Sequence, residues 1–306
     1  MIRNFLFHRV SPERDKLWDP MDVPLFDKCI RYISAHYQVV LLEDLIAGKV
    51  QAGKKKLATI SFDDGYKDNI VYAAPILEKY NCKASFYVVI DCIENNMPTW
   101  THIFEYCFQF TAIKKINIDF DFLPPEYRVT SLDTEESRLA YERKLVPFLK
   151  TIPNAQRVEV MQRVVDTYTD ITIPPLMMNW EDLKVLKNKG HYIGSHTTTH
   201  CMLATVTDEA ELQNELLHSA KVIEQKLGHF PVTISYPGGS YNATTIKMSK
   251  AAGYTMGLAV KQDMYDPAKD DIFEIPRISL NNEPWWKNVL RITHILENIK
   301  KIIRYR

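Results

Sequence analysis

Residues 57–66 read Leu57-Ala58-Thr59-Ile60-Ser61-Phe62-Asp63-Asp64-Gly65-Tyr66, an apolar run that ends in two carboxylates and a glycine. A short run of β-branched and aromatic residues that stops at a turn residue predicts a buried strand. Neighbouring side chains at a strand end point in different directions. One carboxylate can therefore ligate a metal while the other faces substrate or water. Taken alone, the segment is equally compatible with a solvated Asp-Asp-Gly turn.

Similar apolar runs recur along the chain, and most are followed by a stretch with apolar residues at three- and four-residue spacing. The expected strands are 2–7, 57–62, 84–90, 192–194, 232–236, 255–260 and 273–280. The expected helices between them are 71–80, 179–189, 209–227 and 244–252. Alternating strands and helices predict an α/β fold with a parallel sheet. About seven such units favour a distorted (β/α) barrel over an open sheet.

The middle of the chain differs from this pattern, because no glycine occurs between Gly65 and Gly190. Helical patterns cover 103–110, 136–150 and 156–168. We expect one barrel domain spanning 1–306, with a mostly helical insertion at about 95–176. A basic amphipathic helix is expected at about 285–306.

Composition excludes several functional classes. The 306 residues contain 38 Lys and Arg against 38 Asp and Glu, so the net charge is zero and a nucleic-acid partner is not expected. Five cysteines without a C-x-x-C motif indicate neither a disulfide framework nor a thiolate zinc site. No segment is typical of a signal peptide or a membrane span, so we expect a cytoplasmic protein.

A second polar strand end carries two histidines in Ser195-His196-Thr197-Thr198-Thr199-His200. Imidazoles four residues apart can meet one metal ion. Together with Asp64 they form a three-ligand set that leaves positions open for water and substrate. Both segments follow a predicted strand, so both are expected at the same end of the barrel.

Three further segments are candidates for the same end. The loop containing Tyr236, Gly238 and Gly239 could supply backbone N–H groups to an oxyanion, although a plain Pro-Gly turn fits it as well. His8 ends the first predicted strand, where an imidazole could act as a general acid or be purely structural. Arg277 could face Asp63 and keep it ionised, or form a surface ion pair.

Together, these motifs resemble those of the polysaccharide deacetylase family, also called the NodB-homology or carbohydrate esterase family 4 fold. Ser61-Phe62-Asp63-Asp64-Gly65 resembles its T-F-D-D-G motif, and residues 195–200 resemble its H-[ST]-x-x-H motif. Residues 236–241 are similar in style to the branch of poly-N-acetylglucosamine deacetylases. The chain has Cys201 where many members have Pro, and it lacks the family's Arg before Tyr236.

The resemblance implies roles for individual residues. Asp64, His196 and His200 would bind a divalent metal, Zn²⁺ first and Co²⁺ or Ni²⁺ as alternatives. Asp63 would be the general base, and His8, near the N-terminus as in the poly-N-acetylglucosamine branch, the general acid. Arg277 is our hypothesis for the missing arginine.

The implied activity is metal-dependent hydrolysis of the N-acetyl group of an amino sugar, with release of acetate. We expect a lipid- or nucleotide-linked precursor of a surface glycan as the substrate and no protein partner. The C-terminal helix could close the barrel or touch the inner face of the membrane. Two other functions stay open: hydrolysis of a non-sugar amide or phosphoester on this fold, and carbohydrate binding without catalysis.

Overall fold

The computed structural model describes residues 1–296 and has a parallel sheet at its centre. Its strand order is β10-β1-β3-β4-β7-β8-β9, and β2 pairs with the first residues of β3. The strands are β1 (Arg3–Phe7), β2 (Tyr37–Val39), β3 (Lys56–Phe62), β4 (Ser85–Val88), β7 (Tyr192–Ser195), β8 (Thr233–Ser235), β9 (Met256–Leu258) and β10 (Ile278–Ser279).

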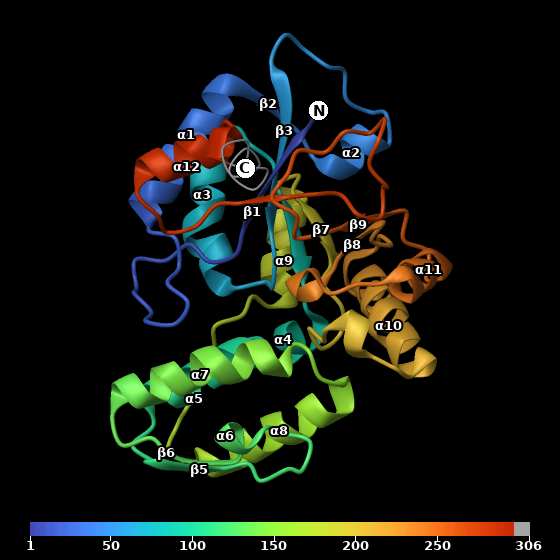
Figure 1. The fold of residues 1–306 in the computed structure, drawn as a ribbon. Coiled ribbons are helices and arrows are strands. Elements are labelled where there is room, and N and C mark those ends of the chain that lie inside the picture. Colours follow the sequence, from blue (N-terminus) through green and yellow to red (C-terminus); the bar gives the residue numbers. More distant parts are fainter. Residues whose placement is uncertain (297–306) are drawn as a thin grey trace, which may run out of the picture.

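Helices connect the strands and cover the outside of the sheet (Figure 1). They are α1 (Val23–His36), α2 (Leu42–Ile46), α3 (Ala74–Lys79) with a π-helical turn before it (Asn69–Ala73), α9 (Trp180–Asn188), α10 (Glu209–Leu227), α11 (Ala243–Ala251) and α12 (Trp285–Ile292). Local signals set several of their ends. The side chain of Asn179 accepts a hydrogen bond from the Asp182 amide at the start of α9, and Gly228 ends α10 at φ 70°.

The segment before α12 brings the two edges of the sheet together. Ile275 forms a parallel bridge with Leu258 of β9, and Ile278 and Ser279 pair with β1. The expected distorted (β/α) barrel is thus confirmed. The expected strand 84–90 was too long, because β4 ends at Val88 and α4 (Ile90–Asn95) begins two residues later.

The sequence prediction also omitted β2, α1 and α2. In α1 the buried residues Phe26, Cys29, Ile30 and Ile33 recur at three- and four-residue spacing, so its amphipathic signal is present. In β2 only three residues pair, which is too few to give a periodic pattern.

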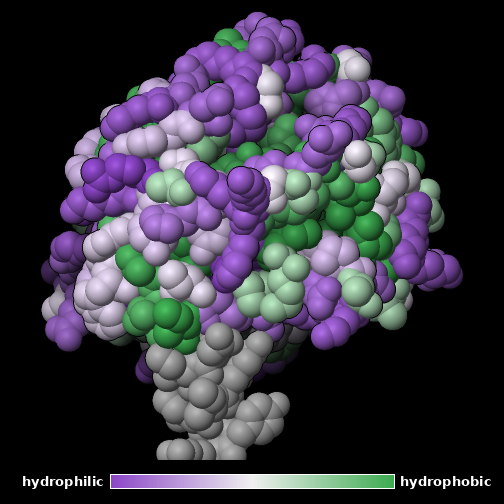
Figure 2. Space-filling model, turned by 90° about the horizontal axis from the view of Figure 1, so that it is seen from above, coloured by the Kyte–Doolittle hydropathy of each residue, from purple (hydrophilic) through white to green (hydrophobic). Residues whose placement is uncertain are grey.

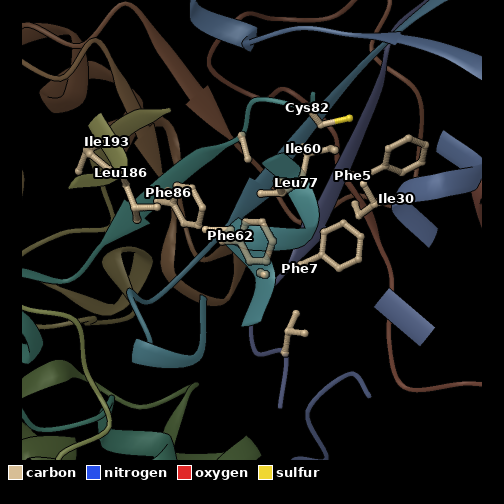
Figure 3. Close-up of a cluster of buried hydrophobic side chains, with 14 of the residues drawn as sticks. Phe5, Phe7, Ile30, Ile60, Phe62, Leu77, Cys82, Phe86, Leu186 and Ile193 are labelled. Carbon is tan, nitrogen blue, oxygen red and sulfur yellow. The ribbon is translucent and has the colours of Figure 1, made fainter. Parts of the chain in front are cut away.

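Successive side chains along each strand point alternately towards the surrounding helices and into the barrel interior. Phe7, Phe62 and Phe86 are register partners on β1, β3 and β4, and their rings stack at centroid distances of 5.5 and 4.9 Å (Figure 3). Asn4 and Thr59, on the opposite faces of these strands, share a 2.9 Å hydrogen bond inside the barrel. The residues that continue the interior faces past the strand ends are His8 and Asp63.

The insertion lies as a separate layer at one end of the barrel (Figure 1). Three long helices dominate it, as the sequence predicts, and they enclose a hydrophobic cluster that includes Phe104, Phe108 and Leu145. A short antiparallel hairpin was not predicted. The elements are α5 (Trp100–Phe110), β5 (Lys115–Asn117), α6 (Pro125–Arg128), β6 (Val129–Ser131), α7 (Glu135–Leu149) and α8 (Asn154–Thr167).

The expected C-terminal helix begins as α12, which contacts α1, but it ends at Ile292, and a turn follows in which His294 has a φ of 65°. Trp285 packs edge-on against Tyr32 at 5.8 Å, and Ile292 is fully buried, so this part closes over the barrel. Residues 297–306 of that prediction lie outside the described residues. Within residues 1–296, every helix is too short or too polar to cross a bilayer.

The end of the barrel away from the insertion carries a hollow of about 560 Å³. Its walls include Ile2, Leu45 and Leu57, with Lys55 and Lys56 beside them. The view from above shows hydrophobic residues gathered within a hydrophilic surround (Figure 2).

Candidate active site

A cavity of about 250 Å³ opens at the carboxyl end of the strands, between the barrel and the insertion. Its walls combine residues that follow barrel strands with residues of α5 and α7. The lining residues are Leu6, His8, Trp18, Asp63, Asp64, Thr101, Glu105, Val146, Lys150, His196, His200, Met202, Gly238, Val260 and Ser279. Five of the predicted site side chains therefore face one cavity.

Asp63 is held by a buried arginine. The two Nη atoms of Arg277 each donate to one carboxylate oxygen of Asp63 at 2.8 Å, and both side chains are at most 3% exposed. The Ser235 hydroxyl donates to Asp63 Oδ2 at 3.1 Å. Burial raises the pKa of Asp63, but Arg277, His196 and His8 together outweigh burial and hold the pKa below its usual value. Asp63 is therefore ionised at neutral pH, and its hydrogen bonds hold it in one orientation.

Asp64 lies between the two histidines. Its Oδ1 is 3.3 Å from His196 Nε2 and 3.4 Å from His200 Nε2. One possible ligand atom from each residue falls within 4.8 Å of the other two. All three side chains are buried.

The donor set fits a divalent metal ion. Asp64 Oδ1 is buried without a hydrogen-bond partner among residues 1–296, although a buried carboxylate oxygen normally has one. His196 bonds the Ser235 carbonyl at 2.8 Å through Nδ1, which leaves the Nε2 lone pair for a cation. Burial lowers the pKa of His200 to about 3 despite the nearby Asp64, so its imidazole is neutral, as metal binding requires.

Two of the three predicted ligands lie on strained backbone, as does Thr197 between the histidines. Asp64, Thr197 and His200 have φ values of 76°, 71° and 62°, in the left-handed region that non-glycine residues rarely adopt. Two hydrogen bonds hold the histidine loop: the amide of Ile90 donates to the Thr197 carbonyl at 3.2 Å, and the Thr197 hydroxyl accepts from the His200 amide at 3.1 Å. Strain maintained in this way is typical of functional sites.

A buried glutamate braces the same loop. Glu215 of α10 accepts hydrogen bonds from the amides of Thr198 and Thr199, both at 3.0 Å, and from the Thr199 hydroxyl at 2.7 Å. Glu215 is 4% exposed. The three consecutive threonines disfavour a long helix, and these hydrogen bonds to α10 hold them in a turn instead.

His8 reaches the cavity because it continues the interior face of β1. Its ring lies edge-on to Trp18 at a centroid distance of 5.6 Å. Burial lowers the pKa of His8, and the nearby Asp64 and Asp63 oppose this effect. Trp18, in the loop between β1 and α1, was missed because nothing in the sequence distinguishes it from other loop aromatics.

The three loop residues predicted to face the substrate have different positions. The Tyr236 ring is buried against Tyr241, and its amide donates to the Leu258 carbonyl, so neither group reaches the cavity. The Gly239 amide donates to the Tyr236 carbonyl at 2.9 Å. Gly238, at φ 58°, lines the cavity.

The sequence suggests Trp100 as a residue that could stack on a sugar ring, but it does not predict the contact that Trp100 makes. Its indole Nε1 donates to the carbonyl of His200 at 3.1 Å, so the insertion holds the backbone of a predicted metal ligand. Arg157 of α8 stacks on the Trp100 ring at 5.2 Å. The hydrogen bond between Trp100 and His200 joins residues 100 positions apart, and no local pattern in the sequence predicts it.

Comparisons with known proteins point to one family. The model of the polysaccharide deacetylase family matches residues 50–134 and 140–257, which together exceed half of the chain. A peptidoglycan-N-acetylglucosamine deacetylase of Bacillus cereus is 35% identical over 72 residues, which are 24% of this chain and 33% of that protein. The chain matches 29% and 33% of the length of two curated relatives.

Solved structures share the fold over nearly the whole chain. The deacetylase PplD of Streptococcus pyogenes, in complex with acetate, superposes with a TM-score of 0.62 at 17% identity, covering 95% of this chain and 97% of that one. IcaB from Ammonifex degensii superposes with a TM-score of 0.61 at 15% identity, covering 95% and 96%.

Proposed function

The chain belongs to the polysaccharide deacetylase family, and on that premise we propose that it hydrolyses the N-acetyl group of an amino sugar and releases acetate. The observation that carries the proposal is the meeting of two functional units in one cavity. One unit is the oriented pair of Asp63 and Arg277, and the other is the ligand set of Asp64, His196 and His200. A binding protein has no need of both.

The three ligands would hold one divalent cation, for which zinc is the proposed identity. When bound, such an ion supplies Lewis acidity to the amide carbonyl and lowers the pKa of water. Asp63 accepts the proton of the attacking water, a role that requires an ionised carboxylate. Arg277 keeps that carboxylate ionised and fixes its plane through two hydrogen bonds.

His8 is the proposed general acid. Its ring lines the same cavity as Asp63, from the neighbouring strand β1. A protonated imidazole donates its proton to the departing amine nitrogen, so that a free amino sugar leaves. We assign the amide of Gly238 as a donor to the carbonyl oxygen of the substrate. Among the three predicted loop residues, Gly238 is the one that lines the cavity.

The proposed substrate is an N-acetylated saccharide of a surface glycan or of its lipid- or nucleotide-linked precursor. A relative named as acting on peptidoglycan N-acetylglucosamine supports an N-acetyl hexosamine. The proposed location is the cytoplasm, with peripheral contact at the inner membrane face through the C-terminal helix. A carboxyl-end cavity closed on one side by the insertion suits the end or a short stretch of a glycan.

Acetate release tests the proposal. The metal-loaded protein is incubated with N-acetylglucosamine oligosaccharides and with nucleotide-linked N-acetyl sugars, and acetate is measured. Asp63→Asn should lower turnover by at least about a hundredfold. Asp68→Asn is the matched control, because Asp68 is a buried carboxylate paired with Arg9 at 2.9 Å outside the cavity, and it should keep turnover. Cleavage of phosphoesters without acetate release would contradict the proposal.

A further inference from the structure

We propose that Glu105 of the insertion is a substrate-positioning residue that donates a hydrogen bond to the sugar beside the acetamido group. The inference rests on the proposed function, because it names a contact made by the same substrate. It assigns the helical insertion a task that the metal ligands and the acid–base pair do not account for. Glu105 lines the cavity together with Asp64 and His200.

The carboxyl group of Glu105 has one oxygen atom without a hydrogen-bond partner among residues 1–296. Its Oε2 is buried and makes no hydrogen bond with any residue of the described part of the chain. A buried polar atom left without a partner destabilises the fold, so proteins rarely keep one without a use. Glu105 itself belongs to the cavity lining, so a ligand bound there would lie beside this carboxyl group.

The surroundings favour the protonated form of this carboxyl group. Burial raises the pKa of Glu105 well above its usual value, and Glu142 of α7 and Asp15 of the loop after β1 add to the effect. Lys150, at the end of α7, and Arg9 oppose it without reversing it. A neutral carboxylic acid has an O–H group that can donate, and sugar hydroxyl and acetamido oxygens accept such bonds.

The helix that carries Glu105 is fixed at both ends. At one end Trp100 bonds the His200 carbonyl at 3.1 Å. At the other end Gln109 donates to Asp15 Oδ1 at 3.0 Å and accepts from the Lys16 amide at 3.1 Å. A side chain on a helix held in this way keeps its position relative to the metal ligands, which is what substrate positioning requires.

The test separates the hydrogen bond from the fold. Glu105→Gln keeps the size of the side chain and an N–H donor, whereas Glu105→Ala removes both. We expect Glu105→Ala to raise KM for an N-acetylglucosamine oligosaccharide about threefold to tenfold, the loss of one hydrogen bond, with kcat changed less. Glu105→Gln should restore KM to within about twofold of the wild type, a difference too small to represent a lost hydrogen bond.

Glu159→Gln is the control. Glu159 is an exposed glutamate of α8 in the insertion, and it lies outside the cavity lining. It should leave KM unchanged. Equal KM values for wild type and Glu105→Ala would overturn the inference, as would a Glu105→Gln variant no better than Glu105→Ala.

A binding measurement keeps this inference distinct from the proposed function. Calorimetric titration of the metal-loaded protein with the same oligosaccharide reports the contact without turnover. If the wild type binds the sugar but releases no acetate, the proposed function fails and the affinity of Glu105→Ala still decides the inference. If Glu105→Ala binds as tightly as the wild type, the inference fails whatever the turnover.

Discussion

Replacing Arg277 with alanine should separate catalysis from metal binding. The guanidinium donates two 2.8 Å hydrogen bonds to Asp63, and neither side chain is more than 3% exposed. Removing one member of such a buried pair leaves an uncompensated carboxylate and costs about 3–5 kcal/mol. With an unfolding entropy of about 2.1 cal/mol/K per residue, the melting temperature should fall by roughly 5–8 °C.

The catalytic effect follows from the pKa of Asp63. Arg277 holds this pKa below its usual value against the opposing effect of burial, so its removal should raise the pKa. The acid limb of the kcat profile, which reports the loss of the ionised base, should therefore move to higher pH. Because orientation is lost as well, kcat at neutral pH should fall by about a hundredfold or more. The metal content should stay near that of the wild type, since Arg277 contacts none of the three ligands through a hydrogen bond among residues 1–296.

The assay combines acetate release from pH 5 to 9 with elemental analysis and thermal melting. Arg277→Lys should recover part of the turnover, because an ammonium group retains the charge but not the two parallel bonds. Arg291→Ala is the control for stability alone, since it breaks a 2.9 Å pair with Glu283 away from the cavity. A kcat profile of Arg277→Ala that superposes on the wild type would refute the assignment of Arg277.

Four further outcomes are expected. His196→Ala should lower the metal content from about one ion per chain to near zero after dialysis, measured by elemental analysis. His8→Ala should lose most acetate release while keeping the metal, and full activity would remove His8 from the mechanism. Trp100→Phe should weaken metal affinity in a chelator competition, because the His200 carbonyl loses its donor, whereas Trp285→Phe should not. Burial raises the pKa of Glu43 in the folded protein above its value in the unfolded chain. The free energy of unfolding of the wild type should therefore fall as pH rises from the unfolded pKa towards the folded pKa. Denaturant titrations should show that the unfolding free energy of Glu43→Gln lacks this dependence on pH.

Strand ends could be predicted because their chemistry is local. A buried run that stops at Asp63, or at His196, shows in one segment both the strand and the polar residues after it. Parallel strands bring these ends together, so ligands far apart along the chain could be grouped from their sequence alone. Arg277 was placed near Asp63 by related reasoning, because it lies within the last expected strand, 273–280.

The insertion could not be predicted in this way. Its helices were visible as periodic patterns, but periodicity does not tell which face of a helix meets the barrel. That Glu105 lines the cavity and that Trp100 bonds His200 depends on packing between segments distant in sequence. The position of Tyr236 could not be predicted for a similar reason, because its amide donates a hydrogen bond to the carbonyl of Leu258 in β9.

Helix α5 joins two properties that protein engineers usually vary independently. Trp100 supports a predicted metal ligand, and Glu105, five residues later, forms part of the wall that a new substrate would have to fit. A library that randomises this helix to change substrate preference will therefore also lower cofactor retention in many of its members. Screening at saturating metal, followed by selection at limiting metal, would separate variants with altered preference from those that have only lost their ion.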